Sequence, residues 1–500
     1  MVATHSAHAA TQKLMWHSCP PSPQGLPDAG MECTSMNVPL NYQQPNGKQI
    51  TVAVSRIKAT DPTKRHGVLF TNPGGPGGAG LDLPRAFKIL MPQSIFDEYD
   101  VIGIDPRFIG ESTPITCGLS AQDATQAFVP LEQNSNFAST SAFMKKVADG
   151  CAANAGDKLP YATTANTARD FDMVRQALGE QKISYFGYSY GTYLGAVYSS
   201  LFPNNTDRIV LDSSVDPGEV WRQQFRSWGP AGELRFPDFL KFAAANDATY
   251  HLGNTQGKVR QTYFGLMNKV NQSPVTLADG TVLNGPMFQE VTFGGLYNDN
   301  QFNGLAALWQ FLNGNTGPSV KNQMLQPSDA AVDNEAAGGL AIACDDVAWS
   351  TSPAQYQLEY NLDSKLFPSF GALGSNIWPC AFWHNSPAEP PVAISSHGPT
   401  NILMLQNLRD PATSYWGALG MHAALGSRSR MVSVDQGGHT VAYLQPNACG
   451  TAAATDYLVS GTLPTTDKFC PAQQSLIHPL TPNAQTDKDK AMRELQKLVK

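Results

Sequence analysis

The sequence predicts an α/β protein: a mostly parallel, doubly wound sheet with helices on both faces, interrupted by a mainly helical insertion. The first observation is residues 183–198, where a short apolar strand passes through a serine flanked by glycines into a helix of small and apolar residues. The second is that strand-like apolar segments alternate with segments of helical apolar spacing, a pattern typical of βαβ units. The third is that this alternation stops near residue 220 and returns near residue 392.

Several short segments are expected to be buried strands, because a strand covered on both faces has an almost continuous apolar sequence. They are GVLFT at 67–71, YDVIGI at 99–104, ISYF at 183–186, RIVL at 208–211, NILMLQ at 401–406 and SRMVSV at 429–434. The segment 50–58 alternates apolar and polar residues and predicts an earlier strand. Helical spacing at 167–178 and 415–425 predicts helices between strands.

The change of pattern divides the chain into three segments. We expect residues 1–219 to form the first part of an α/β core and residues 220–391 to form a helical cap. Residues 392–500 are expected to form the second part of the core, with a C-terminal disulfide loop. Helical spacing and aromatic residues dominate the cap segment, and clear buried-strand patterns stop there.

Composition narrows the classes of function. The chain has 500 residues and a net charge of -7 without a basic block, so nucleic acid is not expected as a partner. No uninterrupted apolar run approaches the roughly 18 residues of a membrane span, so none is predicted. No C-x-x-C or Cys/His metal spacing occurs, and we predict neither a metal nor a cofactor. We expect a monomer.

Eight cysteines fall into four neighbouring pairs along the chain, and each pair is predicted to form a disulfide. Many other pairings are possible, and eight reduced thiols in a cytosolic enzyme are the alternative. The predicted bridges are Cys19–Cys33, Cys117–Cys151, Cys344–Cys380 and Cys449–Cys470.

The first ten residues contain neither a positively charged stretch nor an apolar stretch of the kind found in an export signal. Ala7-His8-Ala9 nevertheless has the small-x-small pattern with which such a signal ends. We expect a secreted protein whose signal has been trimmed, and a cytoplasmic protein is the alternative.

The stretch Gly187-Tyr188-Ser189-Tyr190-Gly191 matches the pattern G-x-S-x-G between a strand and a helix. A turn this sharp forces strained backbone angles on the serine, and the two glycines let strand and helix approach each other. The turn lifts the hydroxyl out of the sheet beside the positive end of the helix. We predict that Ser189 is a nucleophile. The alternative is an ordinary serine in a glycine-rich loop.

Asp410 and His439 are predicted to complete a catalytic triad. Like Ser189, each follows directly after a predicted strand, and functional residues of a parallel sheet gather beyond the carboxyl ends of its strands. Because a serine hydroxyl is too weak an acid to attack a carbonyl unaided, His439 must take its proton and Asp410 must hold the imidazole in the correct tautomer. The chain order Ser, Asp, His is that of α/β-hydrolases. Taken singly, Asp410 could belong to a common turn and His439 to a surface loop.

The glycine-rich stretch at 72–80, directly after the strand 67–71, is predicted to supply half of an oxyanion hole. The expected donors are the backbone N–H groups of Tyr190 and Gly75. A flexible loop is the alternative.

These stretches together resemble the α/β-hydrolase family of secreted actinobacterial tripeptidyl aminopeptidases, which is related to the proline iminopeptidases. The resemblance extends from about residue 15 to about residue 475, and Cys449 and Cys470 also fit it. It implies serine-dependent removal of short peptides from free N-termini without a metal or cofactor. The stretches that carry it are NPGGPGGAG at 72–80, DVIGIDPRFIGEST at 100–113, YFGYSYGTYLGAVY at 185–198, RIVLDSSVDP at 208–217, RDPAT at 409–413 and GGHTVAY at 437–443.

The sequence contains fewer patterns that identify substrate-binding residues. The family usually has Gly-Val where this chain has Phe108-Ile109, so Phe108 is predicted to alter the shape of the pocket. An exopeptidase must bind a cationic α-amino group with carboxylates. Asp345 and Asp346 are the predicted clamp, with Glu219 and Glu233 as weaker candidates. Two solvated or helix-capping aspartates are the alternative.

The predicted function is that of a serine exopeptidase, a serine protease and aminopeptidase that cleaves di- or tripeptides from free N-termini through an acyl-enzyme. Its expected partner is a peptide or peptide-like small substrate. The alternative is an esterase, lactonase or biosynthetic tailoring enzyme that acts on a peptide-like natural product with the same triad. A binding or structural protein that has kept the fold but lost the chemistry is a third possibility.

Overall fold

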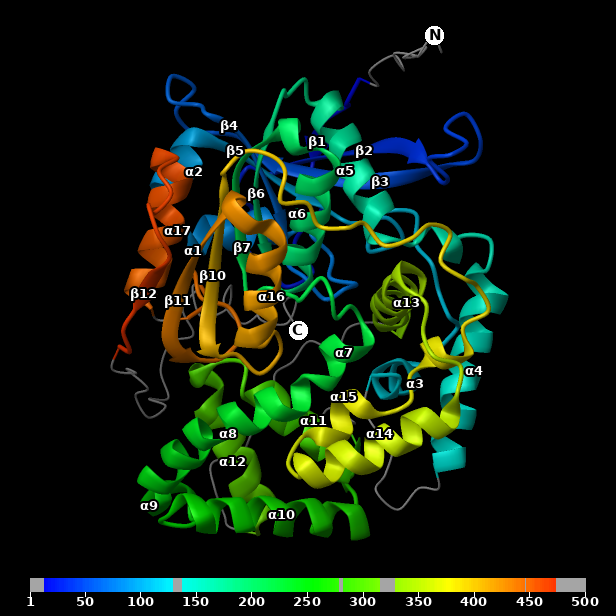
Figure 1. Cartoon of the computed structure of the whole chain (residues 1–500), viewed down its shortest axis with the longest axis vertical. Coiled ribbons are helices and arrows are strands. Elements are labelled where there is room, and N and C mark those ends of the chain that lie inside the picture. Colours follow the sequence, from blue (N-terminus) through cyan, green and yellow to red (C-terminus); the bar gives the residue numbers. More distant parts are fainter. Residues whose placement is uncertain (1–12, 129–136, 278–281, 315–328, 446, 474–500) are drawn as a thin grey trace.

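The computed structural model describes residues 13–128, 137–277, 282–314, 329–445 and 447–473. Its centre is a 10-stranded sheet with the strand order β1-β2-β3-β5-β4-β6-β7-β10-β11-β12, shown in Figure 1. The pairs β1/β2, β2/β3 and β3/β5 are antiparallel. The other neighbouring pairs, from β5/β4 to β11/β12, are parallel. The expected α/β-hydrolase fold with a mostly parallel sheet is therefore confirmed.

Every strand expected from the sequence is present in the central sheet, which also contains β1, β2 and β12. The strands are β1 His17–Ser18, β2 Glu32–Pro39, β3 Gln49–Ile57, β4 Gly67–Asn72, β5 Tyr99–Ile104, β6 Ile183–Tyr188, β7 Thr206–Asp212, β10 Ile402–Arg409, β11 Ser429–Gly437 and β12 Lys468–Cys470. Ser189, Asp410 and His439 follow β6, β10 and β11, so the parallel arrangement brings them to the same edge of the sheet.

Helices cover both faces of the sheet. Successive residues of β7 show the division: Val210 belongs to one apolar cluster, whereas Ile209 and Leu211 belong to the other. This alternation follows from the two-residue period of a strand and explains why buried strands are apolar throughout. One face is covered by α1 Leu83–Leu90, α2 Gln93–Glu98 and α17 Ala448–Ser460, and the other by α5 Thr164–Ala177, α6 Tyr190–Leu201 and α16 Tyr415–Leu425.

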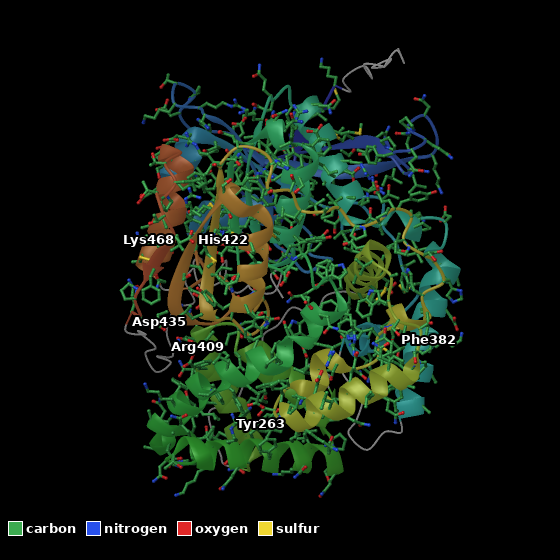
Figure 2. The ribbon with its side chains drawn as sticks, viewed as in Figure 1. Tyr263, Phe382, Arg409, His422, Asp435 and Lys468 are labelled. Carbon is green, nitrogen blue, oxygen red and sulfur yellow. A yellow bond between two sulfur atoms is a disulfide. The ribbon has the colours of Figure 1, made fainter. Side chains whose placement is uncertain are left out.

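The described part of residues 220–391 is mainly helical and lies below the carboxyl edge of the sheet in Figure 1. It has an aromatic core of its own, in which the ring of Tyr263, labelled in Figure 2, contacts Phe236, Trp309 and Phe370. Its elements are α7 Arg222–Arg226, α8 Trp228–Ala245, α9 Asp247–Tyr250, α10 Gln256–Gln272, β8 Val275–Thr276, β9 Val282–Leu283, α11 Gly285–Gly295, α12 Phe302–Leu312, α13 Asp329–Asp346, α14 Pro353–Leu366 and α15 Gly371–Ser375.

A polar junction joins this helical layer to the sheet. Arg409, the last residue of β10, donates to Asp238 of α8 at 2.9 Å and to Asp435 of β11 at 2.8 Å. Arg235 of α8 donates to the same Asp238 at 2.6 Å. Arg409 and Asp435 are labelled in Figure 2, where the sheet meets the helices below it.

Two helices from the earlier part of the chain also join the layer. They are α3 Ala121–Gln126 and α4 Phe137–Ala155. Met144 of α4 packs with Tyr356, Ile377 and Ala381 in one apolar cluster. The helical layer is thus built from residues on both sides of position 220, and the boundaries at 219 and 391 stay a prediction.

The eight cysteines pair as the sequence analysis predicted. The bridges are Cys19–Cys33, Cys117–Cys151, Cys344–Cys380 and Cys449–Cys470. Cys344–Cys380 fixes the end of α13. Of the helices that the structure describes, none combines the length and the hydropathy needed to cross a bilayer.

Candidate active site

Ser189 lies at the sharp turn between β6 and α6, as predicted. Its backbone angles are φ 55° and ψ -123°, a sparsely populated conformation for a residue other than glycine. The flanking glycines are needed sterically: a Cβ at Gly187 would lie 2.6 Å from the carbonyl oxygen of Gly191, and one at Gly191 would lie 2.8 Å from Asn72 Oδ1. The backbone N–H of Ser189 donates to the carbonyl of Asp212 at 3.0 Å. This is the geometry of a nucleophile elbow.

Asp410 and His439 form a buried pair. His439 Nδ1 lies 3.0 Å from Asp410 Oδ1 and 2.9 Å from Oδ2, and both side chains are almost fully excluded from solvent. The carboxylate therefore fixes the tautomer in which Nδ1 carries the proton and Nε2 is left to accept one. No hydrogen-bond partner for Nε2 is found among the described residues, so Nε2 is not hydrogen-bonded to the Ser189 hydroxyl in this structure.

Thr413 completes the surroundings of the acid, and the sequence analysis did not identify it. Its hydroxyl donates to Asp410 Oδ2 at 3.0 Å and lies 3.3 Å from His439 Nδ1. The backbone N–H groups of Ala412 and Thr413 donate to Asp410 Oδ1 at 2.9 and 3.0 Å. The signal was available as an Asx-turn pattern, because Asp410 is followed by Pro411 and by Thr413 three positions later.

The cap segment contacts the histidine through Tyr297, which the sequence analysis also missed. The carbonyl of Tyr297 accepts the backbone N–H of His439 at 2.7 Å, and the tyrosine ring packs edge-on against the imidazole with centroids 5.1 Å apart. Gln445 donates to the carbonyls of Tyr297 and His439 at 2.8 and 3.2 Å. Residue 297 follows α11 in a region without a recognisable motif, so only the folded chain reveals this contact.

The glycine stretch 72–80 lies against the elbow. A Cβ at Gly74 would be 2.9 Å from the Cβ of Ser189 and 3.4 Å from the backbone nitrogen of Tyr190. Gly74 and Gly75 have φ values of 104° and 109°, which side chains rarely tolerate. Gly74 therefore sits next to the backbone nitrogen of Tyr190, and Gly75, the other predicted oxyanion donor, is the next residue in the chain. The role of Gly75 and Tyr190 as donors stays a prediction.

Helix α13 packs directly on that stretch. A Cβ at Gly339 would lie 2.6 Å from the carbonyl oxygen of Pro76, and one at Gly77 would lie 3.0 Å from the backbone nitrogen of Gly339. Only glycines allow the helix and the loop to come so close.

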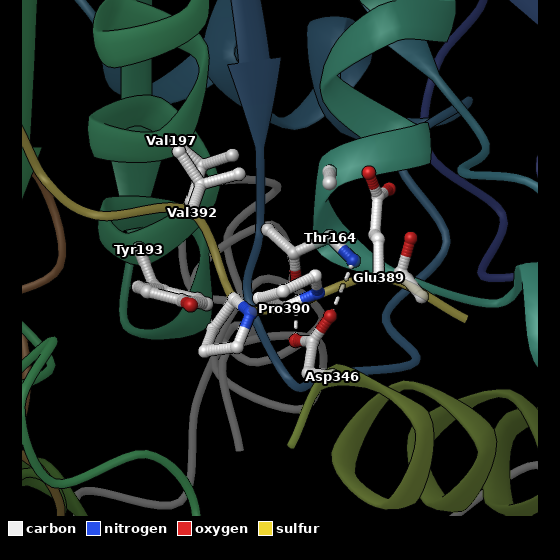
Figure 3. A pocket seen from close by; sticks show the side chains of 10 residues that line it. Thr164, Tyr193, Val197, Asp346, Glu389, Pro390 and Val392 are labelled. Carbon is white, nitrogen blue, oxygen red and sulfur yellow. Dashed lines mark hydrogen bonds between the residues drawn. The ribbon is translucent and has the colours of Figure 1, made fainter. Parts of the chain in front are cut away.

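The end of α13 places Asp345 and Asp346 inside the protein. Asp346 accepts the Thr164 N–H and hydroxyl, each at 2.6 Å, and the Trp221 indole N–H at 3.2 Å. Figure 3 shows the Thr164 contacts beside a cavity of about 10 Å³, room for about one water molecule. The Tyr190 hydroxyl lies 3.0 Å from that of Thr164, so a polar chain connects the elbow to α13.

Asp345 has fewer partners. Its Oδ2 accepts the Trp383 indole N–H at 3.0 Å, whereas its Oδ1 has no hydrogen-bond partner among the described residues. Burial raises the pKa of Asp345 to about 8 and that of Asp346 to about 6. No hydrogen bond within the described ranges links either acid directly to Ser189, Asp410 or His439.

The other two predicted substrate residues lie in different surroundings. Glu219 is exposed at the start of the cap segment, and partial burial with the nearby Asp216 raises its pKa. Phe108 is fully buried with φ 74°, and its carbonyl accepts from Asn334 of α13 at 2.9 Å. Their roles in binding stay predictions. Among the described residues, no group of three or more His, Cys, Asp or Glu side chains is placed to hold a metal ion.

Comparisons with known proteins show the family of this chain. A family model described as TAP-like protein matches residues 368–470, which include Asp410 and His439. The chain is 34% identical to the tripeptidyl aminopeptidase of Streptomyces lividans, with 94% of this chain and 88% of that protein covered. It is 28% identical to the serine protease Hip1 of Mycobacterium tuberculosis, with 92% and 91% covered. It is 27% identical to carboxylesterase B of the same organism, with 93% and 92% covered. Because the Streptomyces similarity extends over nearly the whole length of both proteins, this chain belongs to the tripeptidyl aminopeptidase family of α/β-hydrolases.

Proposed function

We propose that this protein is a serine exopeptidase that removes short peptides from free N-termini through an acyl-enzyme. The observation that carries the proposal is the buried Asp410–His439 pair at the same sheet edge as the strained Ser189. Membership of the tripeptidyl aminopeptidase family supports a peptide as the substrate, and so does the similarity to a serine protease.

The reaction follows from the roles of these groups. The Ser189 hydroxyl attacks the scissile carbonyl while His439 Nε2 takes its proton, and Asp410 stabilises the imidazolium that forms. The N–H groups of Tyr190 and Gly75 stabilise the oxyanion. His439 then gives the proton to the leaving amine, so the N-terminal fragment stays on Ser189 as an ester. A water molecule, deprotonated by His439, hydrolyses that ester and releases the fragment.

The recognition of the substrate's ammonium group is assigned to the end of α13. Asp346 already accepts three hydrogen bonds, whereas Asp345 has a carboxylate oxygen without a partner among the described residues, in an apolar setting. A substrate ammonium would supply the missing counter-charge, so Asp345 is the stronger candidate for the clamp. Glu219 and Phe108 are the weaker candidates, because the carboxylate of Glu219 is exposed to solvent and Phe108 carries no charge.

Three further properties belong to the same proposal. The four disulfides fit a protein that is secreted into an oxidising compartment. The protein acts as a monomer. Residues 220–391 act as the cap that selects the substrate, with the core formed by residues 1–219 and 392–500.

Paired peptide substrates test the proposal. Tripeptidyl anilides with free N-termini should be cleaved, and the same peptides with acetylated N-termini should not. Equal cleavage of both forms would remove the ammonium clamp and indicate an endopeptidase. Turnover of p-nitrophenyl esters without cleavage of any peptide would instead indicate an esterase, the activity named for the Mycobacterium relative. An Asp345→Asn variant should lose the preference for free N-termini, whereas Glu219→Gln should keep it.

A further inference from the structure

Asp212 occupies a junction within the active site. It is the last residue of β7, the strand that lies between β6 and β10 in the sheet. Its side chain is fully buried. Its backbone carbonyl accepts the N–H of Ser189 at 3.0 Å, so this residue fixes one side of the nucleophile elbow.

The carboxylate of the same residue holds the segment that follows His439. Oδ1 accepts the N–H of Val441 and Oδ2 accepts the N–H of Ala442, both at 2.8 Å. The neighbouring Ser213 donates its hydroxyl to Oδ1 at 3.1 Å and accepts the N–H of Thr440 at 2.9 Å. Asp212 and Ser213 together therefore bind three consecutive amides directly after the catalytic histidine.

The histidine segment needs this support. Thr440 and Tyr443 have φ values of 75° and 68°, which are unfavourable for residues other than glycine. Such a conformation persists only when surrounding contacts hold it. Asn407 of β10 also donates to the carbonyls of Gly438 and Thr440, each at 2.8 Å. Hydrogen bonds with Asp212, Ser213 and Asn407 therefore hold the segment. Asp212 also accepts the backbone N–H of Ser189, so it links this segment to the nucleophile elbow.

A carboxylate fits this place better than its neutral counterpart. Each of its two oxygens receives one backbone N–H, whereas an asparagine would turn an NH₂ group toward one of the two amides. Burying the charge has a cost, because burial raises the pKa of Asp212 to about 7. The N–H groups of Ala442 and Val441 and the nearby His439 lower this pKa but do not offset the effect of burial.

We propose that Asp212 is a positioning residue of the active site: its carboxylate holds residues 441 and 442, and its backbone carbonyl holds Ser189, so that a single residue sets the separation of nucleophile and base. The role rests on the proposed serine chemistry but not on the identity of the acyl group. It applies equally to a peptide, an ester or a fluorophosphonate.

The test is the Asp212→Asn variant, assayed by p-nitrophenyl ester hydrolysis on active sites counted by the amount of fluorophosphonate bound at completion. We expect kcat per titrated site to fall roughly 10- to 100-fold, as expected when reacting groups are displaced by about 1 Å, with KM changed by less than about two-fold. The rate constant of fluorophosphonate labelling should fall by the same factor. Wild-type kcat per titrated site in this variant would overturn the proposal.

A matched control separates positioning from general destabilisation. Asp333 of α13 is also buried, and its carboxylate also holds the backbone of a loop. It accepts the N–H groups of Cys117, Gly118 and Leu119 at 3.2, 3.3 and 3.1 Å. Asp333→Asn should lower the melting temperature but leave kcat per titrated site at the wild-type value. An equal loss of kcat in both variants would contradict a specific role for Asp212.

Ser213→Ala covers the case in which Asp212→Asn does not fold. It leaves the carboxylate in place and removes the acceptor of the Thr440 N–H, so kcat per site should fall roughly three- to ten-fold. An unchanged kcat would count against the proposal. Because all these assays use an ester and a fluorophosphonate, a failure to cleave peptides would refute the exopeptidase function without affecting them.

Discussion

The hydroxyl of Thr413 donates to the carboxylate of Asp410, the acid of the predicted triad, at 3.0 Å. That bond fills a lone pair of the acid that the histidine does not use. It also prevents the carboxylate from turning away from the imidazole, which lies 3.3 Å from the same hydroxyl.

Replacing Thr413 with Val is therefore expected to lower kcat roughly ten-fold, because a hydrogen bond to a charged group is lost and the Asp410 carboxylate becomes freer to rotate. Thr413→Ser keeps the hydroxyl and should retain most of the activity. Steady-state hydrolysis of a p-nitrophenyl ester measures both variants. Equal rates for Val and Ser at this position would show that the hydroxyl does not matter.

The Asp410–His439 pair makes a stronger prediction. His439→Ala and Asp410→Asn should each reduce kcat by roughly 10³- to 10⁴-fold, because the first removes the base and the second leaves the imidazole in the wrong tautomer. Circular dichroism should show a folded protein in both cases. His422 is partly buried and contacts Ser429 and Asp467 rather than the triad, so His422→Ala is the control and should retain wild-type turnover.

The contact between α13 and the glycine stretch predicts a remote effect on rate. A methyl group at Gly339 would lie 2.6 Å from the carbonyl oxygen of Pro76 and must push the loop that carries Gly75. Gly339→Ala should lower kcat roughly ten-fold or more, since a small displacement of the oxyanion donors is costly. Apart from the backbone of its own helix, a methyl group at Gly304 of α12 would meet no described atom within 4 Å, so Gly304→Ala should leave kcat unchanged. Identical rates for the two variants would contradict the proposed oxyanion loop.

Asp345 predicts an unusual dependence of stability on pH. Burial raises its pKa from 3.8 to about 8, so the folded protein keeps a proton that the unfolded chain releases above about pH 4. The contribution of the Asp345 proton to the free energy of unfolding is fully present below about pH 4. It is lost as pH rises to about 8, at up to about 1.4 kcal/mol per pH unit. Urea unfolding at pH 5 and pH 8 should therefore show a larger loss of stability for the wild type than for Asp345→Asn. The exposed Asp28→Asn should behave as the wild type does. Parallel pH slopes for all three proteins would show that Asp345 is ionised throughout.

The sequence was sufficient for the residues that come from strand ends. Ser189, Asp410 and His439 each follow an apolar segment, and such segments predict strands buried on both faces. A parallel sheet brings the carboxyl ends of these strands to the same edge. The fold class follows from the same periodicity. Short-range glycine patterns likewise predicted the elbow and the loop beside it, because positive φ angles and close backbone approach leave few alternatives to glycine.

What the sequence could not predict depends on contacts between distant segments. Tyr297 reaches His439 only because the cap segment folds back over the sheet edge, and no local pattern at residue 297 distinguishes it from other aromatic residues. Helix α4 joins the helical layer through Met144, although its composition of small and polar residues gives no sign of which partner it covers. The difference between Asp345 and Asp346 is also tertiary, since Thr164 and Trp221 lie more than 100 positions away from Asp346 in the chain.

The glycine contact between α13 and the loop at 74–77 also indicates which positions of residues 220–391 can be changed without disturbing the active site. A variant library directed at Gly339 would mostly sample damaged enzymes, because any side chain added there reaches the loop before it reaches a substrate. Leu358, Leu362 and Leu366 on the outer side of α14 are exposed and carry no such constraint. Natural relatives with different substrates should therefore vary in the outer helices of the cap and keep small residues along the inner face of α13.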